Sequence, residues 1–174
     1  MSATATSEPS RVMVLMGSDS DLPVMRGAIA VLGEFQVSVR TEVTSAHRTP
    51  DRTRDIVRSS QAQVFIVGAG GAAHLAGTVA ALTTRPVLGV PLAATSLGGL
   101  DALLATVQMP AGIPVPTLAI GEPGARNAAL AAIAILALSD SDLDQRLTAY
   151  RRDMVAGVEA RAERVRQALQ SGTP

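Results

Sequence analysis

The sequence of 174 residues contains no cysteine, no lysine and no tryptophan, and only 2% of its residues are aromatic. The absence of cysteine excludes disulfides, thiolate-ligated zinc, iron–sulfur clusters and cysteine nucleophiles. Without lysine, the protein cannot form a Schiff base through a lysine side chain, and it lacks the lysine of a nucleotide P-loop. Only two histidines occur, His47 and His74, so a metal centre with several histidine ligands is not expected. The scarcity of aromatic rings also argues against a binder of single-stranded nucleic acid.

The charge balance gives no sign of a charged macromolecular partner. The 15 basic residues offset 15 acidic ones, so we expect the protein to bind neither nucleic acid nor a membrane surface. Residues 1–10 are small and polar, unlike a secretory signal, and predict a disordered N-terminal tail on a cytoplasmic protein. The stretch 64–82 is almost uncharged, but its glycines and β-branched start favour a strand, a glycine loop and a helix over a membrane span.

Short apolar runs alternate with helix-like segments through residues 11–139, and this alternation predicts an α/β catalytic domain. The expected strands are Val12–Met16, Gln36–Val43, Val64–Val67, Pro86–Val90 and Thr117–Ile120. Repeated strand–helix units indicate a parallel sheet with helices on both faces. We therefore expect a three-layer, flavodoxin-like fold with a central five-stranded parallel sheet, in the order 2-1-3-4-5. Ligands of such sheets bind beyond the carboxyl ends of the strands, so the loops 17–21, 44–49 and 68–74 should share one edge.

Residues 140–170 are expected to form a long C-terminal helix. Apolar side chains recur there at spacings of three and four, as in an amphipathic helix, at Leu143, Leu147, Tyr150, Met154, Val158, Ala162, Val165 and Leu169. Such a helix would be roughly 40 Å long, more than a domain of this size can cover. We therefore expect its far end to pack on a neighbouring subunit. The alternative is a bent helix that folds back on its own domain.

The first strand-end loop has the sequence GSDSD at residues 17–21. Ser18 and Asp21 have the spacing of a capping box, which the motif by itself favours. In a functional interpretation, the hydroxyls and free N–H groups at this helix start hold a phosphate, and Asp21 accepts hydrogen bonds from a sugar.

The second loop has the sequence SAHRTP at residues 45–50. Ser45, Arg48 and the following helix start all favour an anion, because an arginine fork matches the oxygens of a phosphate. Thr49 and Pro50 are typical of an N-cap and a first helical residue. An unperturbed histidine has a pKa of about 6.5, so His47 is a candidate to donate and accept a proton near neutral pH. The alternative is a merely solvated or capping histidine.

The third loop has the sequence GAGGAAHL at residues 68–75. It resembles a dinucleotide fingerprint, but residues 56–100 contain no acidic residue to hold a ribose, so a nicotinamide site is excluded. What remains is a loop walled by the backbone of Gly70 and Gly71, which suits a small carboxylate or a planar ring. His74 either contacts the substrate or fixes this loop through hydrogen bonds.

Together these motifs resemble the class I N5-carboxyaminoimidazole ribonucleotide mutase (PurE) family of purine biosynthesis. The resemblance runs from about Val12 to Tyr150 and includes VQMPxGxPV at 107–115, LAIG at 118–121 and NAAL at 127–130. The proline-rich segment 108–116 is either a lid over the same sheet edge or a stiff connector. The chain departs from the family pattern at Ala76, Thr78, Ala102 and Pro116. None of these departures removes a group that the chemistry needs.

The resemblance implies an isomerase that moves a carboxylate from the exocyclic nitrogen of N5-carboxyaminoimidazole ribonucleotide to ring carbon C4. The product is 4-carboxy-5-aminoimidazole ribonucleotide, and the implied reaction uses no metal and no organic cofactor. Gly70 and Gly71 would surround the migrating carboxylate, with His74 close by. The resemblance also implies a homo-octamer with active sites near subunit boundaries.

The resemblance further assigns roles to the polar residues of the first two loops. Ser18, Ser45 and Arg48 would hold the 5′-phosphate, and Asp21 would bind the ribose hydroxyls. His47 would protonate the carbamate nitrogen, which releases CO₂ in the pocket, and would then remove the C4 proton after recapture. One group can do both because the two proton transfers are opposite in sense.

Three other functions remain open at this point. The chain could carboxylate the aminoimidazole ribonucleotide directly with CO₂, as class II enzymes of the family do. It could also be a non-catalytic nucleotide-binding or assembly module. A flavin-binding relative of flavodoxin fits the fold, but the near absence of aromatic residues counts against it.

Overall fold

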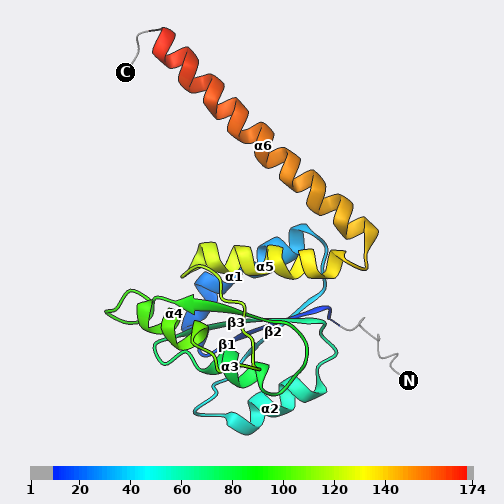
Figure 1. Ribbon diagram of the computed structural model, residues 1–174, viewed down its shortest axis with the longest axis vertical. Coiled ribbons are helices and arrows are strands. Elements are labelled where there is room, and N and C mark those ends of the chain that lie inside the picture. Colours follow the sequence, from blue (N-terminus) through cyan, green and yellow to red (C-terminus); the bar gives the residue numbers. More distant parts are fainter. Residues whose placement is uncertain (1–9, 172–174) are drawn as a thin grey trace, which may run out of the picture. The chain divides into compact units, whose positions relative to one another are not determined.

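The computed structural model describes residues 10–171 (Figure 1). The tail predicted for residues 1–10 therefore lies, apart from Ser10, outside the described residues. The chain divides into two compact units at the Ile135–Leu136 junction. The first unit contains the sheet and the helices packed on it, and the second contains the last long helix.

The sheet has four parallel strands in the order β2-β1-β3-β4. Their bounds are β1 Val12–Met16, β2 Val39–Val43, β3 Val64–Gly70 and β4 Val87–Leu92. The strands β1, β3 and β4 are almost entirely apolar and buried, as strands covered on both faces must be. The edge strand β2 is partly exposed and carries Arg40 and Glu42. The predicted fold class and the order of these four strands are confirmed.

The prediction of a fifth strand at residues 117–120 is wrong. This segment instead forms a single parallel bridge, between Gly89 and Thr117. Gly89 donates to the Pro116 carbonyl and accepts from the Leu118 amide, each at 2.9 Å. The next residue of β4 that faces this edge is Pro91, which has no N–H to donate, so the regular ladder is interrupted there. The Pro91 carbonyl accepts from the Gly121 amide at 2.9 Å.

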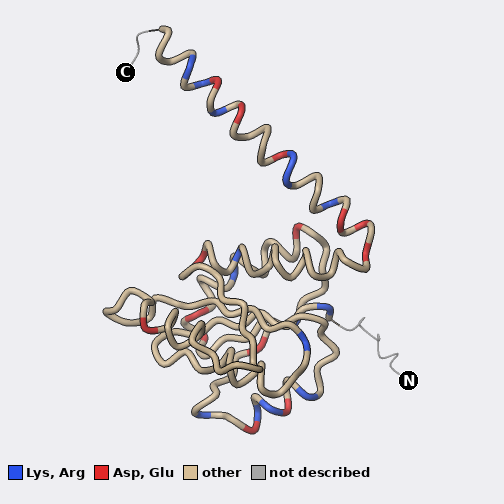
Figure 2. The backbone as a smooth tube through the Cα atoms, in the orientation of Figure 1, with Lys and Arg blue, Asp and Glu red and all other residues tan. Residues whose placement is uncertain are grey.

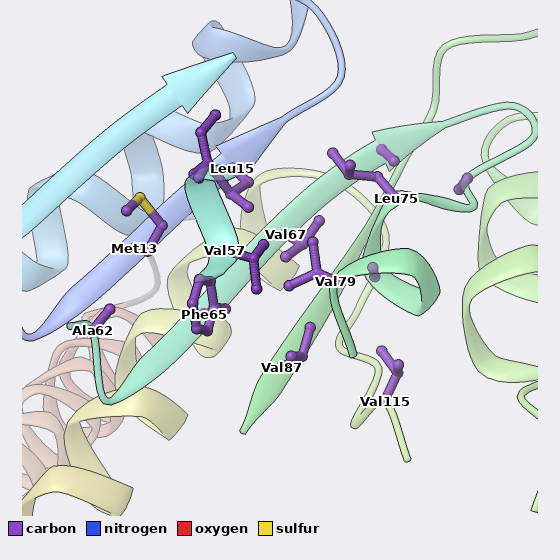
Figure 3. Packing of buried hydrophobic residues seen from close by; sticks show 14 of the residues in the cluster. Met13, Leu15, Val57, Ala62, Phe65, Val67, Leu75, Val79, Val87 and Val115 are labelled. Atoms are coloured by element: carbon purple, nitrogen blue, oxygen red, sulfur yellow. The ribbon is translucent and has the colours of Figure 1, made fainter. Parts of the chain in front are cut away.

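Five helices cover the two faces of the sheet (Figure 1). On one face lie α1 (Leu22–Glu34) and α5 (Glu122–Ala137), and on the other α2 (Pro50–Ser59), α3 (Leu75–Ala80) and α4 (Leu100–Val107). Side chains two residues apart on a strand point to the same face of the sheet. Phe65 and Val67 of β3 therefore share a face, where they point toward Val57 of α2 and Val79 of α3 (Figure 3). This core fixes the sheet edge at which the loops emerge.

The second unit consists mainly of α6 (Ser141–Gln170), a helix of 30 residues and roughly 45 Å. Its first turn is capped by the Asp140 side chain, which accepts from the Leu143 amide at 3.0 Å. Charges of both signs alternate along α6 (Figure 2). Several apolar side chains of the predicted stripe are more than half exposed, namely Met154, Val158, Val165 and Leu169.

The low-charge stretch 64–82 forms β3, a glycine loop and α3, as predicted from its glycines. Across residues 10–171, every helix is too short or too polar to cross a bilayer.

Candidate active site

The loops that follow β1, β2 and β3 meet at the carboxyl edge of the sheet and enclose a cavity of about 470 Å³. The cavity is lined by Gly17, Ser18, Ser20, Asp21, Ser45, Ala46, His47, Arg48, Ala69, Gly70, Ala72, Leu75 and Ala94. Six residues named from the sequence are therefore brought together there: Ser18, Asp21, Ser45, His47, Arg48 and Gly70. The two others, Gly71 and His74, lie beside the cavity without lining it.

The first loop forms the predicted capping box. The Ser18 amide donates to Asp21 Oδ2 at 3.0 Å, and the Ser20 amide donates to Ser18 Oγ at 3.3 Å. These bonds close one turn of 3-10 helix, Asp19–Asp21, ahead of α1. Partial burial raises the pKa of Asp21 above 3.8, while hydrogen bonds from the backbone of Ser18 and Gly17 act to lower it. A partly desolvated carboxylate at a cavity wall is well suited to accept hydrogen bonds from sugar hydroxyls.

In the second loop, Arg48 connects the first two loops. Its Nη2 donates to the Gly17 carbonyl at 3.2 Å, and its amide donates to Ser45 Oγ at 3.2 Å. Within residues 10–171 the Arg48 guanidinium forms no ion pair with a carboxylate. Its charge is therefore available to an anion that enters beside Ser18 and Ser45.

Thr49 occupies the predicted N-cap position of α2, but its side chain does not cap the helix. Its hydroxyl oxygen instead accepts from the Ser45 amide at 3.0 Å, and the hydroxyl donates to the Ser45 carbonyl at 3.1 Å. The threonine thus closes the loop that carries His47, a role that the N-cap pattern did not predict.

His47 and His74 form a pair. His47 Nε2 lies 2.8 Å from His74 Nδ1, and the rings meet edge to face with centroids 4.9 Å apart and planes at 80°. A hydrogen bond between two ring nitrogens needs a proton on one and a lone pair on the other. The pair can therefore share one proton across this contact. The sequence placed both histidines in neighbouring loops but gave no signal for their direct contact.

The glycines of the third loop are required by close packing. A Cβ on Gly70 would lie 2.5 Å from the Ala94 Cβ, and Gly71 has a φ of +59°, which side chains rarely adopt. Ala94 belongs to the loop after β4, a fourth strand-end loop that the sequence analysis did not include. The Thr95 hydroxyl anchors this loop by donating to Asp101 Oδ2 at 2.7 Å, which helps to hold the pKa of Asp101 below 3.8. The rule that placed the first three loops at this edge also applies to the fourth.

None of residues 108–116 lines the cavity. A separate hollow of about 870 Å³, beside Pro86 and Val87 where β4 begins, is instead lined by Gly112, Ile113, Pro114 and Pro116. This hollow lies at the amino end of β4, whereas the cavity lies at the carboxyl ends of the strands. In the described part of the chain, no three His, Asp or Glu side chains are close enough to hold a metal ion.

Comparison with known proteins gives consistent matches. Residues 11–156 match the family model described as AIR carboxylase. The N5-carboxyaminoimidazole ribonucleotide mutase of Pyrococcus abyssi is 51% identical over 147 residues, 83% of each chain. The Escherichia coli K12 protein of the same name is 49% identical over 152 residues, 86% of this chain and 90% of that protein. The Mycobacterium tuberculosis protein of that name is 47% identical over 168 residues, 93% of this chain and 95% of that protein.

Two solved structures show the same fold. A crystal structure of Treponema denticola PurE superposes with a TM-score of 0.74 at 23% identity, covering 92% of this chain and 96% of that chain. A single-residue variant of PurE2 from the same organism gives a TM-score of 0.81 at 22% identity, covering 90% of this chain and 98% of that chain.

Proposed function

The chain belongs to the AIR carboxylase family, and we propose from this premise that it is an N5-carboxyaminoimidazole ribonucleotide mutase of purine biosynthesis. It is an isomerase that moves a carboxylate from the exocyclic nitrogen of its substrate to ring carbon C4. One observation carries this assignment to the site: Ser18, Ser45, Arg48 and His47 converge on one cavity.

The phosphate end of the substrate binds between the first two loops. Ser18 and Ser45 line the cavity from the first and second loops, and the Arg48 guanidinium reaches from the second loop to the Gly17 carbonyl of the first. Arginine and hydroxyl donors together neutralise and orient a phosphate. Asp21, one turn further along the first loop, then accepts from the ribose hydroxyls. The heterocycle extends from there toward the third loop.

His47 moves the proton that the rearrangement needs. As an imidazolium it protonates the carbamate nitrogen, the C–N bond breaks, and CO₂ and the aminoimidazole are left in the cavity. Ring carbon C4 attacks CO₂ to form the new C–C bond, and neutral His47 then removes the C4 proton. The proton given at the start is regained at the end, so the reaction is a balanced isomerisation.

The surrounding residues favour recapture of CO₂ over its escape. Gly70, Ala69, Ala72 and Ala94 wall the cavity with little more than backbone, which leaves a small space beside the ring. His74, hydrogen-bonded to His47, orients the acid–base ring and shares its proton. These steps are proton transfers and carbon-bond changes only, so we propose that the enzyme needs neither a metal ion nor an organic cofactor.

Substrate preference tests the proposal directly. Turnover is measured with the carbamate ribonucleotide, and in parallel with unmodified aminoimidazole ribonucleotide plus bicarbonate, both in the presence of a chelator. The mutase is expected to use the carbamate much faster at low bicarbonate. Faster turnover of the unmodified ribonucleotide with bicarbonate would contradict the proposal and favour a direct carboxylase.

We also propose that the enzyme is a homo-octamer in which the far end of α6 packs on a neighbouring subunit. The exposed stripe of α6 supports association, as does a second exposed apolar row in α4 and the turn before it. That row consists of Leu97, Leu100, Leu104 and Val107. Apolar rows of this length are rarely left in contact with water. Because its substrate is a phosphorylated intermediate of central metabolism, we place the enzyme in the cytoplasm.

A further inference from the structure

Three buried polar side chains stand out in the described part of the chain, and all are threonines: Thr44, Thr53 and Thr106. Two of them lie together beneath the loop that carries His47. Thr44 is 2% exposed and Thr53 is fully buried. Burying a hydroxyl is unfavourable unless it is hydrogen-bonded, so the partners of these two side chains carry information about their role.

The hydroxyls form a continuous network. Thr44 Oγ1 lies 2.8 Å from Thr53 Oγ1 and 3.2 Å from Thr49 Oγ1. Thr49 Oγ1 in turn accepts from the Ser45 amide at 3.0 Å and donates to the Ser45 carbonyl at 3.1 Å. Each hydroxyl has a single proton. Thr49 donates to Ser45, so Thr44 is the donor in its contact with Thr49. The Thr53 hydroxyl donates to the Thr49 carbonyl at 3.2 Å, which leaves its oxygen to accept from Thr44, whose proton is then shared between two oxygens.

Thr44 is the centre of this network of hydroxyls. Its hydroxyl contacts Thr53 of α2 on one side and Thr49 on the other, and Thr49 closes the loop from residue 45 to residue 49. The amide of Thr44 is held separately by the Met16 carbonyl at 2.9 Å, as part of the contact between β2 and β1. Loss of the hydroxyl would therefore loosen the loop while leaving the sheet contact in place.

We propose that Thr44 is a positioning residue for this enzyme, whose buried hydroxyl fixes the loop that presents Ser45 and Arg48 to the phosphate of the substrate. The inference rests on the proposed function for the identity of the ligand. Thr44 does not line the cavity, so it acts only through Thr49 and the loop backbone. Loss of its hydroxyl should affect binding of the phosphate more than the chemical step.

Isosteric substitution tests this role. Thr44→Val keeps the side-chain volume and removes the hydroxyl, whereas Thr44→Ser keeps the hydroxyl. We expect Thr44→Val to raise KM about fivefold, as loss of one buried hydrogen bond would, with a smaller change in kcat. Thr44→Ser should stay within about twofold of the parent KM. Thr53→Val removes the hydrogen-bond partner of Thr44 in α2 and the donor to the Thr49 carbonyl. It should also raise KM and should add little to the effect of Thr44→Val.

Thr106→Val is the matched control. The Thr106 hydroxyl is equally buried, but it donates to the Ala102 carbonyl within α4 and contacts no loop of the site. Thr106→Val should lower the melting temperature about as much as Thr44→Val does, but it should leave KM unchanged. An unchanged KM in Thr44→Val, or an equal rise in Thr106→Val, would overturn the proposal.

Ribose 5-phosphate binding, measured by calorimetry, keeps the test independent of the mutase assignment. Weaker binding by Thr44→Val with retained binding by Thr44→Ser supports the positioning role even if the parent lacks mutase activity. Equal binding by the parent, Thr44→Val and Thr53→Val overturns it even if the parent is an active mutase. If Thr44→Val does not fold, Thr53→Val and Thr44→Ser decide the question by the same comparison.

Discussion

At the scale of single residues, the site combines one cation, one partly buried carboxylate and a pair of histidines. Each is held by backbone groups or by another side chain of the site: Arg48 by the Gly17 carbonyl, Asp21 by the Ser18 amide, and His47 by His74. Groups fixed before the substrate arrives lose little entropy on binding, which favours both affinity and orientation.

Asp21→Asn is expected to stabilise the protein and to weaken substrate binding. Because burial raises the pKa of Asp21, the folded protein holds the carboxyl proton more tightly than the unfolded chain does. Stability from this group therefore falls as the pH rises from 3.8 through the folded pKa. Asparagine keeps an oxygen for the Ser18 amide and has no charge to desolvate. The melting temperature should be higher than that of the parent at neutral pH, and this gain should shrink below pH 3.8.

The same Asp21→Asn variant should show a higher KM, because the amide is a weaker acceptor for ribose hydroxyls. Asp19→Asn, at an exposed neighbour in the same turn, serves as the control and should change the melting temperature little. A lower melting temperature for Asp21→Asn at neutral pH would contradict the prediction.

Arg48→Ala should weaken binding of the phosphorylated substrate by about 2 kcal/mol, or about thirtyfold in KM. The control is Arg58→Ala, which removes an exposed arginine from the last turn of α2, away from the cavity. Steady-state kinetics on both variants make the comparison. If the two substitutions change KM equally, Arg48 has no specific role in holding the phosphate.

At the scale of elements, loop geometry depends on how closely neighbouring segments approach. The third loop packs on the loop after β4 so tightly that Gly70 has no room for a side chain. Gly70→Ala should therefore shift this loop, lower kcat and reduce the melting temperature. Gly33→Ala in α1 is the control, because a Cβ there meets no atom within 4 Å and alanine favours a helix. Thermal unfolding and kinetics of both variants test the point, and an unaffected Gly70→Ala enzyme would contradict it.

Most helices and strands could be predicted from the sequence, because the spacing of apolar residues and the glycine-rich or polar loop motifs depend on local structure. The strand Val12–Met16 has its predicted bounds, and the first three loops meet at the predicted edge. The fifth strand was mispredicted because Pro91, which lies in another strand, has no N–H and interrupts the regular ladder. The His47–His74 contact and the bond between Thr44 and Thr53 were not predicted, because both depend on packing between elements rather than on spacing along the chain.

At the scale of the whole molecule, the exposed stripe of α6 predicts association between copies. Val158→Glu combined with Val165→Glu places charges on two side chains that are 61% and 60% exposed. The substitutions should reduce the molar mass measured by light scattering, because a buried unpaired carboxylate is costly at an interface. Ala160→Glu adds a charge at an exposed position away from the stripe and should leave the mass unchanged. An unchanged mass for the double variant would show that this stripe is not an interface.

The proposed mechanism requires His47 to carry the proton for carboxylate migration. Turnover of the carbamate ribonucleotide by His47→Asn, measured beside product binding by calorimetry, shows whether it does. The substitution should reduce kcat by about a thousandfold or more while product still binds within about threefold of the parent affinity. Turnover near the parent rate, with the variant folded and product bound, would contradict the account.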